Sequence, residues 1–177
     1  MHGMKYCQNI MNEIKFRLAE KSDIDDVFEV FKAAIQKMIE NEIFQWDEVY
    51  PDKNILAEDI LKGQLYIGCV DNEIVSVYVI NDEYDEQYRN GDWCYRNLSY
   101  KVLHRLCVNP KVQNRGIGRK TMNHIEKEVK AKGIECIRLD AFTLNPVALK
   151  LYENLGYSKV GFADFRKGKF YLMEKKL

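Results

Sequence analysis

The chain has no long apolar segment and no excess of either charge. Its longest apolar runs, such as Ile74–Ile80, are strand-sized, whereas a membrane-spanning helix needs ~20 apolar residues. Its 27 basic and 27 acidic side chains cancel, so no overall field draws the protein to nucleic acid or to an anionic membrane. We therefore expect neither nucleic acid nor a membrane as a partner.

Cysteine and histidine are sparse and scattered. The five cysteines form no C-x-x-C pair and have no zinc-site spacing with the three histidines. The first residues also lack an apolar stretch of the kind that directs export. The expectation is that the protein binds no metal, keeps its thiols free and works in the reducing cytoplasm.

What the chain does contain is enough apolar sequence for one core. It has 177 residues, of which 46% are hydrophobic, as is usual for one domain. No repeat, low-complexity tract or linker divides it. We expect a loose leader over residues 1–13, in which Met4 and Met11 leave the natural start open, and a single domain over residues 14–177.

Hydrophobic periodicity predicts strands and helices in mixed order. The predicted strands are Ile14–Leu18, Leu65–Val70, Ile74–Ile80, Tyr100–Val108, Ile134–Phe142, Tyr157–Phe165 and Phe170–Lys175. The predicted helices cover about residues 22–40, 53–62, 117–132 and 146–155. Hairpins combined with one strand–helix–strand crossover indicate an α+β fold, with a central mixed sheet of six to seven strands flanked by helices.

The segment Val108–Thr121 (VNPKVQNRGIGRKT) passes from a strand through a glycine turn directly into a helix. The first N–H groups of a helix have no partner within it, and the helix dipole makes that end positive. Four basic residues and no acidic one lie within Asn109–Lys120. These features predict an anion site, most naturally for a pyrophosphate. A tight connection with a solvated basic surface is the alternative.

Two common phosphate motifs do not fit this turn. A P-loop that ended at Lys120 and Thr121 would need glycines where Asn114 and Arg119 stand. A dinucleotide fingerprint that began at Gly116 would need a glycine at Thr121.

The turn instead matches Q/R-x-x-G-x-G/A, as Gln113-Asn-Arg-Gly-Ile-Gly118, and a second block follows as Asn145-Pro-Val-Ala-Leu-Lys-Leu-Tyr-Glu-Asn-Leu-Gly-Tyr157. With these two blocks in order, the sequence resembles the GNAT N-acetyltransferase superfamily. The blocks cover about residues 102–157, and the order of elements agrees over nearly the whole chain. The resemblance implies a GNAT-like acyl-CoA N-acyltransferase fold in which the strands Tyr100–Val108 and Ile134–Phe142 splay apart.

The resemblance also implies that acetyl-CoA lies between those two strands. The backbone of Leu106, Cys107 and Val108 would pair with the pantetheine arm, and an N–H near Leu106–Cys107 would stabilise an oxyanion. The pyrophosphate would be held by the turn, through Gln113, Asn114, Arg115, Gly116, Ile117, Gly118 and Arg119. Asn145 would contact the pantetheine arm, and Ala148 would leave room for it.

Tyr152 is the predicted general acid. Attack of an amine on the thioester expels a thiolate, and a tyrosine remains protonated at neutral pH and can donate a proton to it. The alternative is that Tyr152 is only a core aromatic side chain on an amphipathic helix.

The predicted general base is His104. Relatives often carry a glutamate on this strand, but here it reads Val102-Leu-His-Arg-Leu-Cys-Val108. Strand alternation would place His104 on one face with Leu106 and Val108, and imidazole titrates in the right range. The pattern H-x-L-x-V resembles the same strand in the arylalkylamine N-acetyltransferases, where a histidine has this role. Three alternatives to His104 as the base remain open: a relay through water, an acceptor that arrives neutral, and a histidine that is purely structural. Cys107 is interpreted as a buried strand residue rather than a nucleophile.

The acceptor is expected to contact the segments that vary in this fold. Candidate side chains are Phe44, Trp46, Tyr50, Tyr84, Asp85, Trp93 and Asp140, the last of which could equally form a structural ion pair. Five acids against one base between Asn81 and Asp92 suggest a cationic amine, although a solvated loop explains them too. The expected acceptors are a small-molecule amine, a protein N-terminus or a lysine; a second copy of the chain, in a homodimer, is a further candidate partner. The alternative function is a non-catalytic acyl-CoA-binding domain.

Overall fold

The computed structural model describes residues 13–177. The predicted leader, apart from residue 13, lies outside the described residues. Within the described part, no helix is long and apolar enough to cross a membrane.

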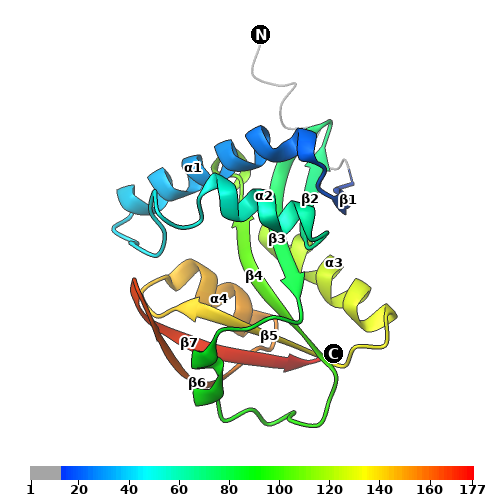
Figure 1. The fold of residues 1–177 in the computed structure, drawn as a ribbon, viewed down its shortest axis with the longest axis vertical. Helices are drawn as coiled ribbons and strands as arrows, with labels where there is room; N and C mark the ends of the chain where they lie inside the picture. Colours follow the sequence, from blue (N-terminus) through cyan, green and yellow to red (C-terminus); the bar gives the residue numbers. More distant parts are fainter. Residues whose placement is uncertain (1–12) are drawn as a thin grey trace.

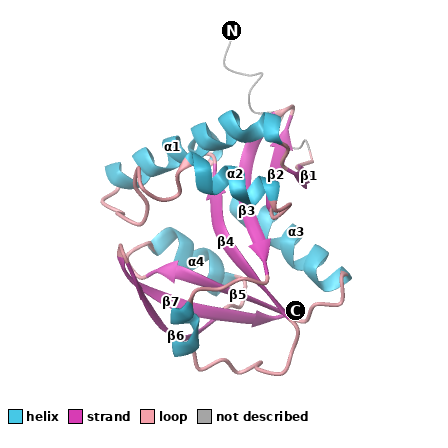
Figure 2. Ribbon diagram, viewed as in Figure 1, coloured by secondary structure: helices cyan, strands magenta, loops and turns pink. Residues whose placement is uncertain are grey.

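One seven-stranded mixed sheet organises the described chain (Figures 1 and 2). Its strands are β1 Lys15–Leu18, β2 Leu65–Val70, β3 Glu73–Asn81, β4 Tyr100–Val108, β5 Cys136–Phe142, β6 Ser158–Phe165 and β7 Gly168–Lys176. Their spatial order is β1-β2-β3-β4-β5-β7-β6. Every neighbouring pair is antiparallel except β4 and β5, which are parallel. The predicted fold class is thus confirmed.

Helices cover both faces of the sheet. They are α1 Ile24–Glu40, α2 Lys53–Leu61, α3 Ile117–Ala131 and α4 Pro146–Asn154. Side chains of α1 and α2 share one buried cluster with β2 and β3, whereas side chains of α3 and α4 share another with β5 and β7. The long polar segment after β3 also contains a short 3₁₀ helix, η3 (Glu86–Asn90).

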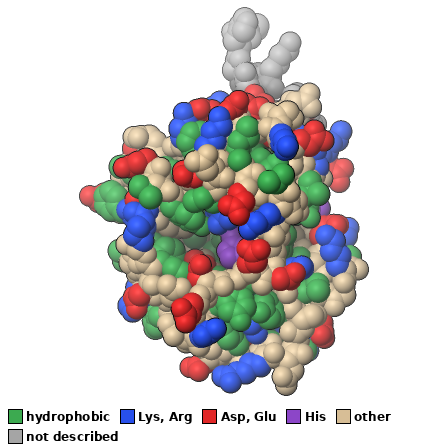
Figure 3. Space-filling view, viewed as in Figure 1, with side chains coloured by type: hydrophobic (Ala, Val, Ile, Leu, Met, Phe, Trp, Pro, Cys, Tyr) green, Lys and Arg blue, Asp and Glu red, His purple; other side chains and the backbone are tan. Residues whose placement is uncertain are grey.

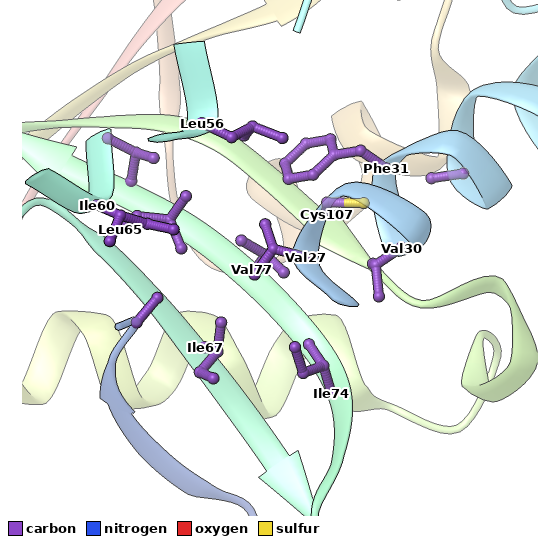
Figure 4. Close-up of a cluster of buried hydrophobic side chains, with 13 residues drawn as sticks. Val27, Val30, Phe31, Leu56, Ile60, Leu65, Ile67, Ile74, Val77 and Cys107 are labelled. Atoms are coloured by element: carbon purple, nitrogen blue, oxygen red, sulfur yellow. The ribbon is translucent and has the colours of Figure 1, made fainter. Parts of the chain in front are cut away.

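The cluster beneath α1 and α2 fixes the N-terminal half. Phe31 from α1 and Leu56 from α2 are both fully buried, and Figure 4 shows them side by side, near Val77 and Cys107 of the sheet. Burial of such side chains contributes about 1.5–3 kcal/mol each. This packing holds the two helices against β3 and β4, next to the point where β4 leaves β5.

Strands β4 and β5 pair over only part of their length. Their parallel register runs from Tyr100 opposite Cys136 to Leu103 opposite Leu139, and no pair follows. Beyond that point β4 continues to Val108 beside β3, and β5 continues to Phe142 beside β7. The two strands therefore diverge into a fork, as the sequence resemblance implied.

A bulge in β4 changes which side chains face which helices. Val79 of β3 pairs with His104, but Val77 pairs with Cys107, so three steps on β4 match two on β3. Arg105 lies in this irregular stretch with a left-handed φ of 51°. An extra residue of this kind reverses the alternation that follows it.

The prediction that His104 shares a face with Leu106 and Val108 is therefore wrong. Cys107 packs with Val77 under α1 and α2, on the face that His104 shares through its pairing with Val79. Leu106 packs instead with the cluster of α3 and α4.

Candidate functional site

A cavity of about 1280 Å³ follows the fork between β4 and β5. It is lined by the diverging ends of both strands, the start of α3, one side of α4, and the segment that joins α1 to α2. Figure 3 shows a hollow on this side of the molecule, with a histidine inside it and charged side chains of both signs around it.

One end of the cavity has the features of a phosphate cradle. Helix α3 begins at Ile117 after Gly116, which is left-handed (φ 76°), and no side chain caps its first N–H groups. A Cβ on Gly118 would lie 3.3 Å from Cδ2 of Leu151, so a larger side chain at this position would crowd α4. Helix α3 has 15 residues. Its dipole and the free N–H groups at its start favour the binding of an anion at this end.

The structure brings most of the predicted pyrophosphate residues together. The predicted cradle residues that line the cavity are Gln113, Asn114, Gly116, Ile117, Gly118 and Arg119. Arg115 does not line it. The N–H of Gln113 donates to the carbonyl of Pro110 at 3.4 Å, so that amide is already engaged within the turn.

Next to the cradle, the fork offers free backbone edges. Residues 104–108 of β4 pair with β3 on one side only, and residues 140–142 of β5 pair with β7 on one side only. An extended ligand with amide groups could therefore bond to either edge as an added strand does. Leu106, Cys107 and Val108, which are expected to pair with the pantetheine arm, line this part of the cavity.

Asn145 and Ala148 stand at the start of α4, beside the fork. The Asn145 side chain caps the helix, accepting from the Ala148 N–H at 3.1 Å, and its amide donates to Gln45 at 2.8 Å. In this structure Asn145 thus joins α4 to the segment after α1.

Tyr152 projects from α4 into the cavity wall. Its side chain is 8% exposed and packs edge-on against Tyr157, with ring centroids 5.8 Å apart. Burial raises the pKa of Tyr152 above its ordinary value, and nearby Asp140 raises it further. The phenol is therefore protonated at neutral pH and has a proton to donate.

His104 lies where β4 leaves β5, and its Nε2 has two oxygen neighbours. These are Oδ1 of Asn81 at 3.1 Å and the carbonyl of Glu83 at 2.9 Å. Both are acceptors, because the Asn81 amide nitrogen donates to Gln64. Nε2 therefore carries the hydrogen and Nδ1 keeps the lone pair. Burial lowers the pKa of His104, so the neutral ring is favoured.

Cys107 has the environment of an inert thiol. It is 3% exposed within the cluster of α1 and α2, and burial raises its pKa to about 12. A thiol that is not ionised at neutral pH is a poor nucleophile.

Asp140 faces the cavity from β5, directly after the last pair of the fork. Its partner is a hydroxyl rather than a cation: Tyr88 donates to Oδ2 at 2.7 Å. Burial raises the pKa of Asp140, although this hydrogen bond opposes the shift.

A buried cation that was not predicted from the sequence, Arg105, also lines the acceptor end of the cavity. The Arg105 guanidinium holds Asp59 through two bonds of 2.7 and 2.9 Å and donates to the Tyr50 hydroxyl at 2.6 Å. The direction of the Arg105 side chain depends on the left-handed bulge, which cannot be predicted from the residue types alone.

The predicted acceptor residues divide into two sets. The residues that line the cavity are Trp46, Tyr50, Tyr84, Asp85 and Asp140, whereas Phe44 and Trp93 do not line it. The Trp93 indole packs instead on Tyr88 and on the guanidinium of Arg138.

The acidic loop is partly neutralised. Asp82 pairs with Lys101 at 2.7 Å, Glu86 with Arg89 at 3.4 Å, and Glu83 with Lys62 at 3.7 Å. Of the five acids, only Glu83 and Asp85 line the cavity. Any attraction of a cationic acceptor by this loop therefore depends on those two.

The family is decided by a match over most of the chain. Residues 29–157 fit the model of the acetyltransferase (GNAT) family. The chain belongs to this family. GNAT acetyltransferases use acetyl-CoA, so acetyl-CoA is the acyl donor that the cavity must accommodate.

Similar proteins extend this assignment. The ribosomal protein bS18-alanine N-acetyltransferase of Salmonella typhimurium is 32% identical over 62 residues, which are 35% of this chain and 42% of that protein. The Escherichia coli enzyme is 31% identical over the same shares of the two chains. The chain thus matches less than half the length of these curated relatives.

Solved GNAT structures share the fold. A GNAT acetyltransferase from Streptococcus agalactiae superposes with a TM-score of 0.82 at 21% identity, over 93% of this chain and 95% of that one. An N-acetyltransferase from Thermoplasma acidophilum, solved in complex with coenzyme A, gives a TM-score of 0.69 at 20% identity, over 93% and 99%.

Proposed function

We propose that this GNAT protein transfers the acetyl group of acetyl-CoA directly to a primary amine at the fork of β4 and β5. The observation that carries the proposal is that one cavity joins the cradle at α3, the two unpaired strand edges, Tyr152, His104 and Asp140. Acetyl-CoA supplies an activated acetyl thioester. The chain holds it through the N–H groups of residues 116–119 and the edge of residues 106–108.

Tyr152 protonates the departing thiolate. Its burial keeps the phenol neutral at pH 7, so its proton is in place when the thiolate departs. Tyr152 lies on α4 and lines the cavity at the fork.

His104 takes the proton of the incoming amine through Nδ1. The hydrogen bonds at Nε2 fix the tautomer that leaves Nδ1 basic, and burial keeps the ring neutral at pH 7. Asp140, on the facing strand, attracts the ammonium form of the acceptor before that proton is lost.

The acceptor class that the site supports is a compact cationic amine with access to a partly apolar entrance. Trp46 and Tyr50 supply apolar surface, whereas Glu83, Asp85 and Asp140 supply negative charge. The bS18-alanine N-acetyltransferases act on a protein N-terminus by name, so a peptide α-amine is the first acceptor to test.

The four described cysteines are free, which suits the reducing cytoplasm.

Acceptor-dependent release of coenzyme A tests the proposal. Matched acceptors are a peptide with a free N-terminal alanine and no lysine, the same peptide with a blocked N-terminus and one lysine, and a polyamine. We expect thiol release with at least one of them, and mass spectrometry should find the acetyl group on its nitrogen.

The second candidate is a non-catalytic acyl-CoA-binding domain, favoured by the absence of a carboxylate on β4. Tight binding of coenzyme A without acceptor-dependent release for any amine would support it and refute the proposed transfer.

A further inference from the structure

Asp140 is held by a residue from outside the two family motifs. The Tyr88 side chain lies on η3, 52 residues away in sequence, yet its hydroxyl donates to Oδ2 of Asp140 at 2.7 Å. Tyr88 is 1% exposed. A buried hydroxyl aimed at one carboxylate oxygen leaves the other, Oδ1, available on the cavity side.

Tyr88 is itself fixed by the chain around it. The Trp93 indole donates to the Tyr88 carbonyl at 2.8 Å, and the two rings stack with centroids 5.7 Å apart. The ring of Tyr84 also stacks on Tyr88, with a centroid separation of 5.6 Å. The ring therefore has little freedom to turn away from Asp140.

The loop that carries Tyr88 is also anchored to the sheet. The Asp92 N–H donates to the carbonyl of Val160 in β6 at 2.7 Å, and the Cys94 N–H donates to Glu174 in β7 at 2.6 Å. The guanidinium of Arg138 lies 4.5 Å from the ring centroid of Trp93. Arg138 and Asp140 belong to β5 at two-residue spacing, so the same strand face anchors the loop and receives Tyr88.

We propose that Tyr88 is a positioning residue of the acceptor site: it fixes one oxygen of Asp140 and thereby orients the other toward the amine. This inference rests on the proposed function, because it assigns a partner to a carboxylate that would meet the acceptor. The consequence is that Tyr88 sets how well the enzyme binds its amine, without touching acetyl-CoA or the reacting atoms.

The charge on Asp140 depends on all the groups that face it. They come from η3 and its loop, from β4, from the segment before α2 and from α4, and are Asp85, Tyr88, His104, Arg105, Tyr50 and Tyr152. Among them Tyr88 donates directly to the carboxylate, so its removal should favour the protonated acid.

The test compares Tyr88→Phe with the wild-type protein, and uses Tyr66→Phe as the control because Tyr66 lies away from the cavity beside Tyr78. We expect Tyr88→Phe to raise KM for the amine about 3- to 10-fold, because the variant loses the one hydrogen bond that holds the Asp140 carboxylate. Its kcat should stay within about twofold, because no reacting group changes. The Tyr66→Phe variant should change neither value.

Carbon-13 NMR of the aspartate carboxyl groups gives a readout that needs no turnover. The Asp140 signal, assigned by its loss in Asp140→Asn, should titrate at higher pH in Tyr88→Phe than in the wild-type protein. With 3-fluorotyrosine placed at position 88, a stronger donor of the same shape, it should titrate at lower pH. Added amine should shift the Asp140 signal in the wild-type protein.

In the Asp140→Asn background, Tyr88→Phe should produce no further rise in KM. An equal rise in that background, or an unchanged Asp140 titration in a folded Tyr88→Phe protein, would overturn the proposal. If no amine is acetylated at all, the proposed function fails, and the response of the Asp140 signal to added amine still decides the role of Tyr88: no response contradicts it.

Discussion

At the scale of single residues, the proposed mechanism makes Tyr152, at the cavity wall, the general acid. Its burial raises its pKa and keeps its proton in place. Tyr152→Phe should lower kcat by about 10²- to 10⁴-fold, the usual contribution of a general acid, and leave the Kd for coenzyme A unchanged. Thiol-release kinetics and calorimetry measure the two quantities. A variant with full kcat across the pH range would remove Tyr152 from the mechanism.

The proposed role of His104 predicts how kcat depends on pH. Burial holds the pKa of His104 below its ordinary value, so the basic form prevails at pH 7 and kcat should fall as the pH drops through that lowered pKa. His104→Gln can still donate to Asn81 or Glu83 but cannot titrate. We expect this acidic limb of the kcat profile to disappear, with a lower plateau; an unchanged limb would assign it to another group.

At the scale of elements, the sequence predicted the type and order of all the main strands and helices of the described residues. The periodic core residues and the turns at Asn109-Pro110 and Gly133 mark their ends well, because these signals are local. The glycine turn was likewise predicted as an anion site from local features.

Contacts between residues far apart in the chain could not be predicted from the sequence. The bulge at Arg105 shows no unusual residue type, yet it reversed the facing of the rest of β4. The contact of Tyr88 with Asp140 joins residues 52 positions apart and needs the folded loop. Trp93 was predicted at the acceptor site because it is aromatic and lies in that loop, but it packs on Arg138.

The turn and first residues of α3 offer a matched pair of arginines: Arg115 precedes the helix, and Arg119 lies in its first turn. Arg119 lines the cavity and Arg115 does not. Arg119→Gln should weaken coenzyme A binding about 10-fold or more, since hydrogen bonds to charged groups contribute roughly 1.5–3 kcal/mol, whereas Arg115→Gln should have a much smaller effect. Calorimetry with coenzyme A compares them, and equal losses would mean that the cradle acts only through general charge.

Helix α2 offers a matched pair for stability. Leu56 is fully buried against Phe31, whereas Leu61 on the same helix is 72% exposed. Leu56→Ala should lower the free energy of unfolding by about 2–5 kcal/mol, and Leu61→Ala should change it by less than about 0.5 kcal/mol. Urea unfolding measures both. Similar values for the two variants would contradict the packing of α2 on the sheet.

At the scale of the whole molecule, the cleft lies between two halves that β4 connects. Figure 1 shows α1, α2 and β1–β3 in one half and β5–β7 with α4 in the other. One end of the cleft is bridged, because Ile43 packs with Phe142 and Phe170 and Asp47 binds Arg166 at 2.7 Å. The proposed transfer would take place at the fork, where the two halves diverge.

A crystal structure of the protein with coenzyme A tests this account most directly. We predict that the pyrophosphate contacts the N–H groups at the start of α3, that the pantetheine arm runs between residues 104–108 and 140–142, and that its sulfur ends near Tyr152. A well-ordered ligand bound through other residues, or a fork that stays empty at saturating coenzyme A, would contradict the account.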